Sequence, residues 1–360
     1  MKKIPIILIL LFSATIGFAQ SLDWEDYDPP STLVVPENPV SRAKFPFVDI
    51  HSHQYRMGPS DLDRLAGEMD EMNMAIMVNL SGRGGARLKD MADNIRNGHP
   101  NRFVLFTNLD WNNVDVPGWQ ERTVQQLVTD FENGAKGLKV FKGLGLSNKD
   151  SKGNRVAVDD PRLDPVWAKC GELGIPVLIH SADPQPFWEP HDNQNERWLE
   201  LKTHSRRKRG DDNPAPWEQI IGEQHNMFKK HPNTQFIAAH LGWLGNDLGR
   251  LGRTMDEIPN MNVGIAAVIA ELGRQPRMAN RFFEKYQDRI LFGKDSYQVH
   301  EFPTYFRVLE SDDEYFPYYK RYHAFWRMYG LDLSDEVLKK VYYKNALRLI
   351  PGLDASLFPE

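Results

Sequence analysis

Val48-Asp49-Ile50-His51-Ser52-His53 joins a short apolar run of β type to a His-x-His pair. On a strand, residues two apart face the same side, so both imidazoles can reach one ion at the end of that strand. Imidazole is a ligand for Zn, Cu, Fe and Ni. A single His-x-His pair is a weak signal, because most histidines lie at the surface or in the core. Its meaning depends on the rest of the chain.

Four further segments share this design. The runs 175–180 and 234–240 each end in a histidine, 289–295 ends in an aspartate, and 137–142 carries two lysines. Apolar runs without alternation are typical of strands that are buried on both faces. Polar side chains at the carboxyl ends of several such strands are typical of a (β/α)8 barrel, whose active sites lie at that end.

The order of strands and amphipathic helices predicts an α/β fold, a (β/α)8 TIM barrel with a long insertion between strands five and six. The predicted strands are 47–53, 74–80, 103–109, 137–141, 177–180, 236–240, 261–267 and 290–292. The predicted helices are 61–72, 87–97, 120–133, 163–173, 247–258, 278–286 and 338–349. The predicted organisation is a signal peptide at 1–19, an extended lead-in at 20–45, the barrel at 46–350 with its insertion at about 183–233, and a tail at 351–360.

The amino terminus predicts export. Lys2 and Lys3 precede an apolar stretch at 4–17, and Gly17-Phe18-Ala19 is a small-x-small cleavage pattern. This pattern favours a secretory signal peptide over a stable membrane anchor, and we expect a periplasmic or secreted protein. The formal net charge of -5 over 360 residues gives no sign of a nucleic-acid partner. Cys170 is the single cysteine, which excludes an internal disulfide.

Three histidines and one aspartate form the predicted metal shell: His51, His53, His180 and Asp295. Zn accepts such nitrogen and oxygen ligands and leaves catalytic sites an open position for water. We therefore predict one divalent ion, Zn, with Mn as the alternative. His240 has two roles open to it, as a further ligand or as the group that moves a proton to or from the substrate.

The motif order His-x-His, His, His and Gly-x-Asp, each at a strand end, resembles the amidohydrolase superfamily, and within it the amidohydrolase-related (amidohydrolase 2) family. The resemblance runs from about Phe45 to Ile350 and includes the tail at 341–349. It implies that the ion is held by His51, His53, His180 and Asp295, and that His240 acts beside it. Binuclear members use a carboxylated strand-four lysine as a bridge, which would be Lys139 here. The family often has Thr or Ser where this chain has Lys294, and this departure leaves the subclass open.

The sequence predicts a secreted metal-dependent hydrolase in which metal-activated water attacks an amide, ester or lactone carbonyl of a small molecule. Catalysis is assigned to His240 and Asp295. The alternatives are a metal-dependent decarboxylase of a small carboxylic acid and a non-catalytic binding protein on the same barrel. Oligomeric state stays open, with a homo-oligomer allowed. The predicted substrate contacts are Arg56, Lys139, Trp188 and Arg274.

Overall fold

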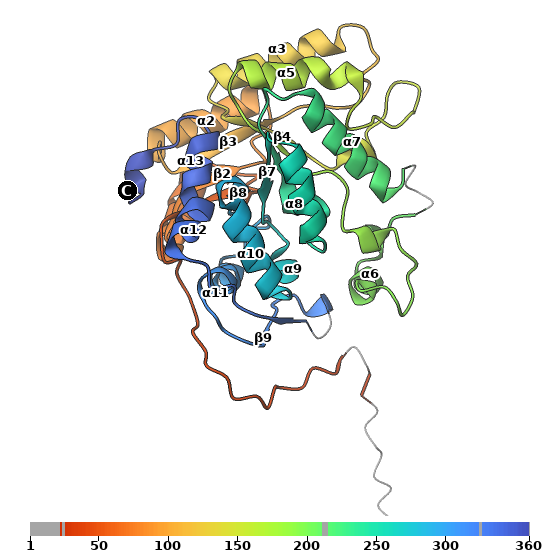
Figure 1. Ribbon diagram of the computed structural model, residues 1–360. Helices are drawn as coiled ribbons and strands as arrows, with labels where there is room; N and C mark the ends of the chain where they lie inside the picture. Colours follow the sequence, from red (N-terminus) through yellow and green to blue (C-terminus); the bar gives the residue numbers. More distant parts are fainter. Residues whose placement is uncertain (1–21, 24–25, 211–214, 324–325, 360) are drawn as a thin grey trace, which may run out of the picture. The chain divides into compact units, whose positions relative to one another are not determined.

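The computed structural model describes residues 22–23, 26–210, 215–323 and 326–359 (Figure 1). Its contacts divide the chain into a unit of Met1–Leu33 and a unit of Val34–Glu360. In the first unit, residues 27–33 form no helix or strand. The predicted signal peptide lies outside the described residues. No helix in the described ranges has the length and apolar character needed to cross a lipid bilayer.

Eight parallel strands form one sheet in the order of the sequence, β1 to β8. The amide of Ile50 in β1 donates to the carbonyl of Phe292, just after β8, at 3.1 Å, and this contact closes the sheet into a barrel. The predicted (β/α)8 barrel is therefore confirmed. The strands are β1 (Phe47–Ser52), β2 (Met74–Asn79), β3 (Phe103–Asn108), β4 (Gly137–Val140), β5 (Val177–Ile179), β6 (Phe236–Ala238), β7 (Met261–Gly264) and β8 (Ile290–Leu291).

Helices follow the strands and surround the barrel, while several short elements gather in the lower half of Figure 1. The helices are α1 (Pro59–Met72), α2 (Ala86–Gly98), α3 (Trp119–Glu132), α4 (Gly143–Leu146), α5 (Asp164–Glu172), α6 (Trp198–Thr203), α7 (Trp217–Lys230), α8 (Leu248–Glu257), α9 (Ile269–Gly273), α10 (Pro276–Tyr286), α11 (Phe302–Glu310), α12 (Asp335–Lys339) and α13 (Asn345–Leu349). A π-helical turn (Lys340–Lys344) joins the last two, and β9 (Phe316–Pro317) pairs with β10 (Arg327–Met328).

The outer helices bury apolar stripes against the strands. α1 places Leu62, Leu65, Met69 and Met72 in the core at steps of three and four residues, which match the helical period. Burying one such side chain contributes roughly 1.5–3 kcal/mol. The helix ends at Asn73, whose φ of 69° departs from the right-handed helix.

The carboxyl-terminal motif closes the fold at the seam between β1 and β8. The amide of Phe292 donates to the carbonyl of Val341 at 3.0 Å. The ring of Phe47 lies 4.8 Å from that of Phe292 and 5.9 Å from that of Tyr342. The tail that sequence analysis assigned to the family pattern therefore packs directly under the strand that carries His51.

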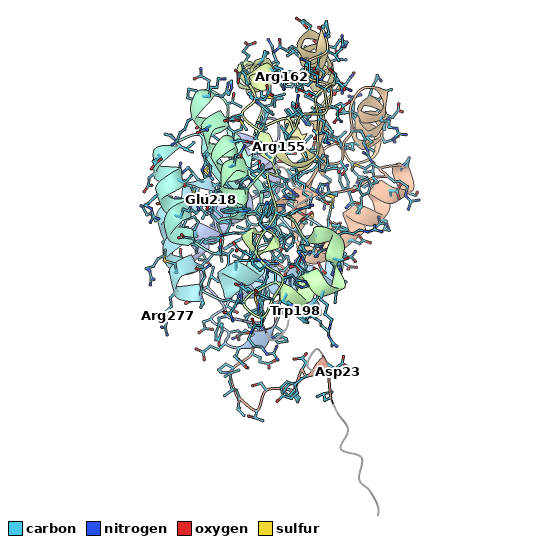
Figure 2. The ribbon with its side chains drawn as sticks, turned by 90° about the vertical axis from the view of Figure 1, so that its right-hand side faces the viewer. Asp23, Arg155, Arg162, Trp198, Glu218 and Arg277 are labelled. Carbon is cyan, nitrogen blue, oxygen red and sulfur yellow. The ribbon has the colours of Figure 1, made fainter. Side chains whose placement is uncertain are left out.

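Two segments extend the barrel at the ends of its strands. Between β5 and β6, α7 is the ordinary outer helix, and the extra length precedes it as α6 with short 3₁₀ turns at Gln185–Phe187 and Ser205–Arg207. The second segment lies between β8 and α12 and contains α11, β9 and β10. Figure 2 shows Trp198 of α6 far from Arg162, which precedes α5. Sequence analysis predicted the first segment and missed the second.

The predicted strand ends need correction. β1, β5, β6 and β7 stop at Ser52, Ile179, Ala238 and Gly264, so the predicted strands run one to three residues too far. His51 lies within β1, whereas His53, His180 and His240 lie one or two residues beyond β1, β5 and β6. His240 leaves the β region, with a φ of 58°.

Candidate metal centre

His51 and His53 lie at the end of β1 with their ring centroids 5.3 Å apart. His51 is buried, and its backbone amide donates to the Asp49 carboxylate at 2.9 Å. The same Asp49 oxygen accepts the amide of Lys294 at 3.1 Å. Asp49 therefore ties the end of β1 to the segment after β8, where Asp295 follows. Burial raises the pKa of Asp49 to about 6, and the two amide hydrogen bonds oppose this rise.

His180 and His240 come from neighbouring strands and meet at the same end of the barrel. Their ring centroids are 4.3 Å apart. His240 Nδ1 lies 2.7 Å from the carbonyl oxygen of Ala266, which requires a proton on Nδ1 and leaves Nε2 as the acceptor of the neutral ring. His240 Nε2 lies 3.2 Å from His180 Nδ1, which then donates. This tautomer leaves a lone pair on His180 Nε2, a buried atom with no hydrogen-bond partner.

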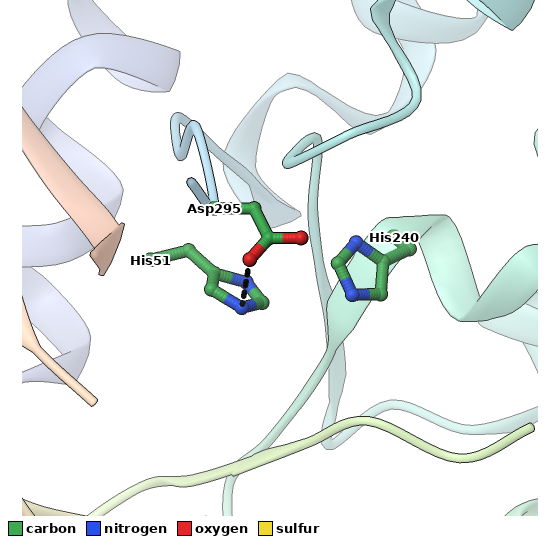
Figure 3. Close-up of side chains that lie close together, drawn as sticks. All are labelled: His51, His240 and Asp295. Atoms are coloured by element: carbon green, nitrogen blue, oxygen red, sulfur yellow. Dashed lines mark ion pairs between the residues drawn. The ribbon is translucent and has the colours of Figure 1, made fainter. Parts of the chain in front are cut away.

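Asp295 follows β8 and faces the histidines (Figure 3). Its amide donates to the carbonyl of His51 at 2.7 Å, and its φ of 82° lies in the left-handed region. One carboxylate oxygen lies 3.9 Å from His51 Nε2 and 3.6 Å from His53 Nε2. The chain thus turns sharply at Asp295 so that its carboxylate meets the end of β1.

The ligand-type atoms of His51, His240 and Asp295 all lie within 4.8 Å of one another. His53 and His180 border this group through the contacts to Asp295 and His240. Two residues of the predicted shell, His51 and Asp295, therefore lie in this group, and the other two, His53 and His180, border it. The third member of the group is His240, whose role the sequence had left open.

The protonation states of these residues suit a cation. Burial lowers the pKa of His51 and His180 well below the usual value, and it lowers the pKa of His53 and His240 to about 4. Neutral imidazoles keep the lone pairs that a metal needs. Both ring nitrogens of His51 are buried without a hydrogen-bond partner among the described residues. Such unsatisfied nitrogens are unfavourable by themselves, and a divalent ion would satisfy them.

Lys139 lies in β4 beside the histidines. It is 1% exposed, and its Nζ has no hydrogen-bond partner in the described part of the chain. Burial lowers the pKa of this amine to about 7. An amine with a pKa near 7 is partly neutral at neutral pH, and the neutral form is the one that can act as a ligand or become a carboxylated bridge. The carboxylated bridge stays a prediction.

A left-handed turn presents His240 to the site. The φ angles of His240, Leu241, Gly242 and Trp243 are all between 54° and 59°. Each L-residue other than glycine in this conformation costs about 1–2 kcal/mol. The turn stacks Trp243 on the His240 ring at 4.5 Å, with an interplanar angle of 26°. Surrounding packing must therefore hold a strained segment in place.

A cavity of about 180 Å³ opens above His180, His240 and Asp295. Both extended segments line it. The residues around it are Lys142, Asp183, Pro184, Phe187, Arg197, Glu200, Arg207, Trp243, Ala267, Ala270, Glu271, Tyr318, Lys320, Tyr322, His323 and Trp326. Residues of the insertion and of the segment after β8 thus form walls of the cavity over the predicted ligands.

None of the four predicted substrate contacts is among the residues that line this cavity, although Lys139 lies in β4 near the histidines. Arg56 is exposed and is not among the residues that line this cavity. Trp188 donates its indole N–H to the carbonyl of Ala215 at 3.2 Å, and its neighbour Phe187 reaches the cavity instead. Arg274 pairs with Glu196 at 2.6 Å and lines a smaller adjoining cavity.

Sequence reasoning missed three residues that shape the centre. Asp49 holds two backbone amides, Ser81 lies 2.9 Å from His53 Nδ1, and Trp243 stacks on His240. Asp49 stands two positions before His51, on the same face of the strand, and that spacing was a usable signal. The contact of Ser81 with His53 depends on the pairing of β1 with β2, and the stacking of Trp243 on His240 depends on the left-handed turn at 240–243.

Comparison with known proteins gives a family and a fold. The model of a family described as amidohydrolase matches residues 111–352, which is more than half of the chain. The match includes His180, His240 and Asp295 and begins after β3. The His51–His53 pair lies outside it, so the assignment of this pair to the site rests on the geometry alone. No curated protein matches the chain significantly.

Solved structures resemble the chain over most of its length. A dihydroxybenzoic acid decarboxylase from Polaromonas sp. with bound manganese and an inhibitor gives a TM-score of 0.52 at 14% identity, over 86% of this chain and 98% of that one. A 4-oxalomesaconate hydratase from Rhodopseudomonas palustris gives 0.51 at 16% identity, over 86% and 97%. An uncharacterised TIM-barrel protein from Bordetella bronchiseptica gives 0.50 at 14% identity, over 84% and 97%. At these identities the likeness concerns the fold alone.

Proposed function

Because this chain belongs to the amidohydrolase family of enzymes, we propose that it is a metal-dependent hydrolase acting on an amide, ester or lactone carbonyl of a small molecule. One observation carries the proposal. Neutral histidines with unsatisfied nitrogens converge with Asp295 on the floor of a cavity, where a divalent ion and a substrate can meet. The membership agrees with the resemblance predicted from the order of the motifs.

His51, His53, His180 and Asp295 would hold the ion, which is Zn in this proposal, with Mn as the alternative. When bound, such an ion lowers the pKa of a water molecule toward neutrality and polarises a carbonyl. A binuclear centre would add Lys139 in its carboxylated form, for which the neutral amine is a precondition. We favour the mononuclear form, because the other four residues already complete a shell.

His240 moves the proton in this proposal. Its Nδ1–H is held by the Ala266 carbonyl, so Nε2 is the atom that takes up and returns a proton at the site. Burial lowers the pKa of His240 to about 4, which keeps the ring neutral and ready to accept at neutral pH. The Asp295 carboxylate lines the cavity and can orient the attacking water.

The first experiment joins metal content to turnover. We expect the purified mature protein to carry about one equivalent of divalent metal and the His51→Ala/His53→Ala variant to lose both metal and activity. His300→Ala is the control, because His300 is exposed and belongs neither to the group of ligand-type residues nor to the lining of the cavity. Activity is screened on lactones, esters, amides and aromatic acids. Equal metal content in all three proteins would remove the basis of the proposal.

The products of that screen separate the rivals. Hydrolysis gives an acid together with an alcohol or amine, whereas decarboxylation releases carbon dioxide from an aromatic or other carboxylic acid. A metal-loaded protein that binds these compounds and turns over none of them would favour the binding-protein alternative. Hydrolysis ranks first because a neutral base, His240, and a carboxylate, Asp295, lie together where a water molecule must be activated.

Export is a separate part of the proposal. Lys2, Lys3 and Gly17-Phe18-Ala19 predict cleavage before Gln20 and delivery to the periplasm or medium. Mass spectrometry of the amino terminus of the exported protein should give Gln20 as the first residue. Recovery of an intact Met1 from the membrane fraction would show an anchor instead.

A further inference from the structure

The walls of the cavity are aromatic and come from both extended segments. Phe187 belongs to the insertion after β5, Trp243 to the turn after β6, and Tyr318, Tyr322 and Trp326 to the segment after β8. At about 180 Å³ the cavity is smaller than the roughly 300–1,000 Å³ of pockets for drug-sized ligands. A small molecule with a flat or ring-shaped apolar body would suit this space.

Most charges on the rim neutralise one another. Arg197 is 8% exposed, donates to Glu200 at 2.8 Å, and also pairs with Glu271. Arg207 donates to the other Glu200 oxygen at 2.6 Å. Two guanidinium groups therefore face two carboxylates, and this cluster adds no net charge to the cavity.

Asp183 pairs with two cations, so one positive charge of this group is not neutralised. Its buried carboxylate accepts from Lys142 at 2.6 Å through one oxygen and from Arg209 at 2.9 Å through the other. One negative charge is thus shared by two cations. Of these two cations, Lys142 lines the cavity, and 42% of its side chain is exposed.

Lys320 supplies a second positive charge. No carboxylate of the described residues lies within ion-pair distance of its ammonium group, which lies 5.9 Å from the centre of the Tyr319 ring. Lys320 lies between β9 and β10 and Lys142 follows β4, and both side chains line the cavity. Lys142, Arg197 and Arg207 each have a carboxylate partner, and Asp295 faces the metal centre, so Lys320 is the one cation of the described cavity lining without a carboxylate at ion-pair distance.

We propose that this rim binds a carboxylate of the substrate, with Lys320 as its principal cation and Lys142 as the second. The substrate is then a small organic anion that carries a carboxylate at the end away from the reacting carbonyl. A carboxylate fits better than a phosphate dianion. Arginine is the residue that binds phosphate in a bidentate manner, and the arginines here already pair with Glu200, Glu271 and Asp183. The placing of the reacting carbonyl at the metal end rests on the proposed function.

A binding experiment on the metal-loaded protein tests the charge without turnover. Isophthalate carries two carboxylates on a planar ring, and 3-carbamoylbenzoate replaces one of them by an amide of nearly equal size. We expect the wild-type protein to bind isophthalate roughly tenfold or more tightly, since a hydrogen bond to a charged group exceeds a neutral one by that order. Lys320→Gln should abolish the preference, and Lys320→Arg should retain most of it. Lys229→Gln is the control, because Lys229 is an exposed lysine of α7.

The outcomes distinguish this inference from the proposed function. Equal affinity of the wild-type protein for both probes would overturn the inference, as would a Lys320→Gln variant that weakens both probes by the same factor. The preference should also fall as salt is raised, because partly exposed charges are screened. If the preference holds and no carbonyl compound is hydrolysed, the carboxylate site stands and the proposed hydrolysis fails. Hydrolysis of neutral and anionic substrates at equal kcat/KM would give the reverse result.

Discussion

Single hydrogen bonds decide the roles of the residues in the centre. The Ala266 carbonyl fixes the proton of His240 on Nδ1, and His240 in turn accepts from His180. His180 Nε2 and both nitrogens of His51 are then the atoms left for an ion. This ordering favours His180 as a ligand and His240 as the group that moves a proton.

The two roles of His240 can be separated by removing the imidazole. We expect His240→Ala to keep its metal and its fold and to lose roughly 10²–10⁴ in rate, which is the usual contribution of a general acid or base. One limb of the pH–rate profile should also disappear. Elemental analysis beside steady-state kinetics gives both readings. Loss of the metal would make His240 a ligand, and full metal with normal turnover would leave it as a core residue.

Lys294 occupies the position where the family often has Thr or Ser. The side chain is 1% exposed, donates to the carbonyl of Ser296 at 3.0 Å and pairs with Glu301. Its ammonium group also lies 5.5 Å from the ring of Tyr319, in the segment that lines the cavity. Lys294 therefore joins the turn that carries Asp295 to Glu301, just before α11.

Breaking the buried pair of Lys294 and Glu301 should lower the free energy of unfolding. Lys294→Met leaves Glu301 without its partner, and removing one member of a buried pair typically lowers the free energy of unfolding by roughly 3–5 kcal/mol. The double variant Lys294→Met/Glu301→Gln should recover part of the loss. Lys285→Met is the matched control, because its partner Asp256 is exposed and such pairs contribute at most about 1 kcal/mol. Urea unfolding measures all three, and equal losses in the single variants would contradict this account.

At the scale of elements, four neighbouring strands end in left-handed residues. Ala182, His240, Ala267 and Asp295 follow β5, β6, β7 and β8, and each has a φ between 57° and 82°. A strand that continued straight would carry its next side chains past the barrel mouth. The left-handed residue bends the chain back, so that side chains from several strands meet above the barrel.

Two glycine-to-alanine variants, one in the turn at 240–243 and one in α7, test the conformation of that turn. Gly242 has a φ of 59°, and an added Cβ would meet other atoms only at 3.5 Å or more, so Gly242→Ala probes backbone conformation rather than space. We expect it to destabilise the protein by about 1–2 kcal/mol and to lower activity through His240. Gly222→Ala within α7 has no atom within 4 Å of its new Cβ and should stabilise by about 0.5–1 kcal/mol. Thermal unfolding that shifts both variants in the same direction would contradict this assignment.

At the scale of the barrel, burying neutral histidines links stability to pH. Burial lowers the pKa of His53, His225 and His240 to about 4, and it lowers that of His51 well below the usual value. The unfolded chain titrates its histidines near 6.5, so it binds more protons than the folded chain as the pH falls below that value. Stability is therefore lost toward acid. Asp49 acts in the opposite sense between about pH 6 and 4, because its raised pKa lets the folded chain bind the extra proton.

We accordingly expect the metal-free protein to lose several kcal/mol between pH 7 and pH 5, at about 2 kcal/mol for each histidine that stays neutral over that range. Urea unfolding at stepped pH measures the slope. His225→Asn should flatten it, because this residue lies away from the metal centre and is held neutral by burial and by Arg250. His300→Asn should leave it unchanged, because His300 is exposed. A flat profile for the metal-free protein would refute this linkage.

The sequence by itself determined the barrel, because apolar runs of strand length are local patterns, and the polar residues that end these runs supplied the prediction of the ligands. It also indicated an insertion after strand five, from chain length alone. It could not supply the role of Asp49, the stacking of Trp243 or the displacement of Trp188 and Arg274 from the cavity. Those depend on which strand ends come together and on how a left-handed residue redirects the chain after each strand. The balance of charge on the rim was likewise decided only by tertiary structure, since Lys142, Arg197 and Lys320 are far apart in sequence and meet because the barrel closes.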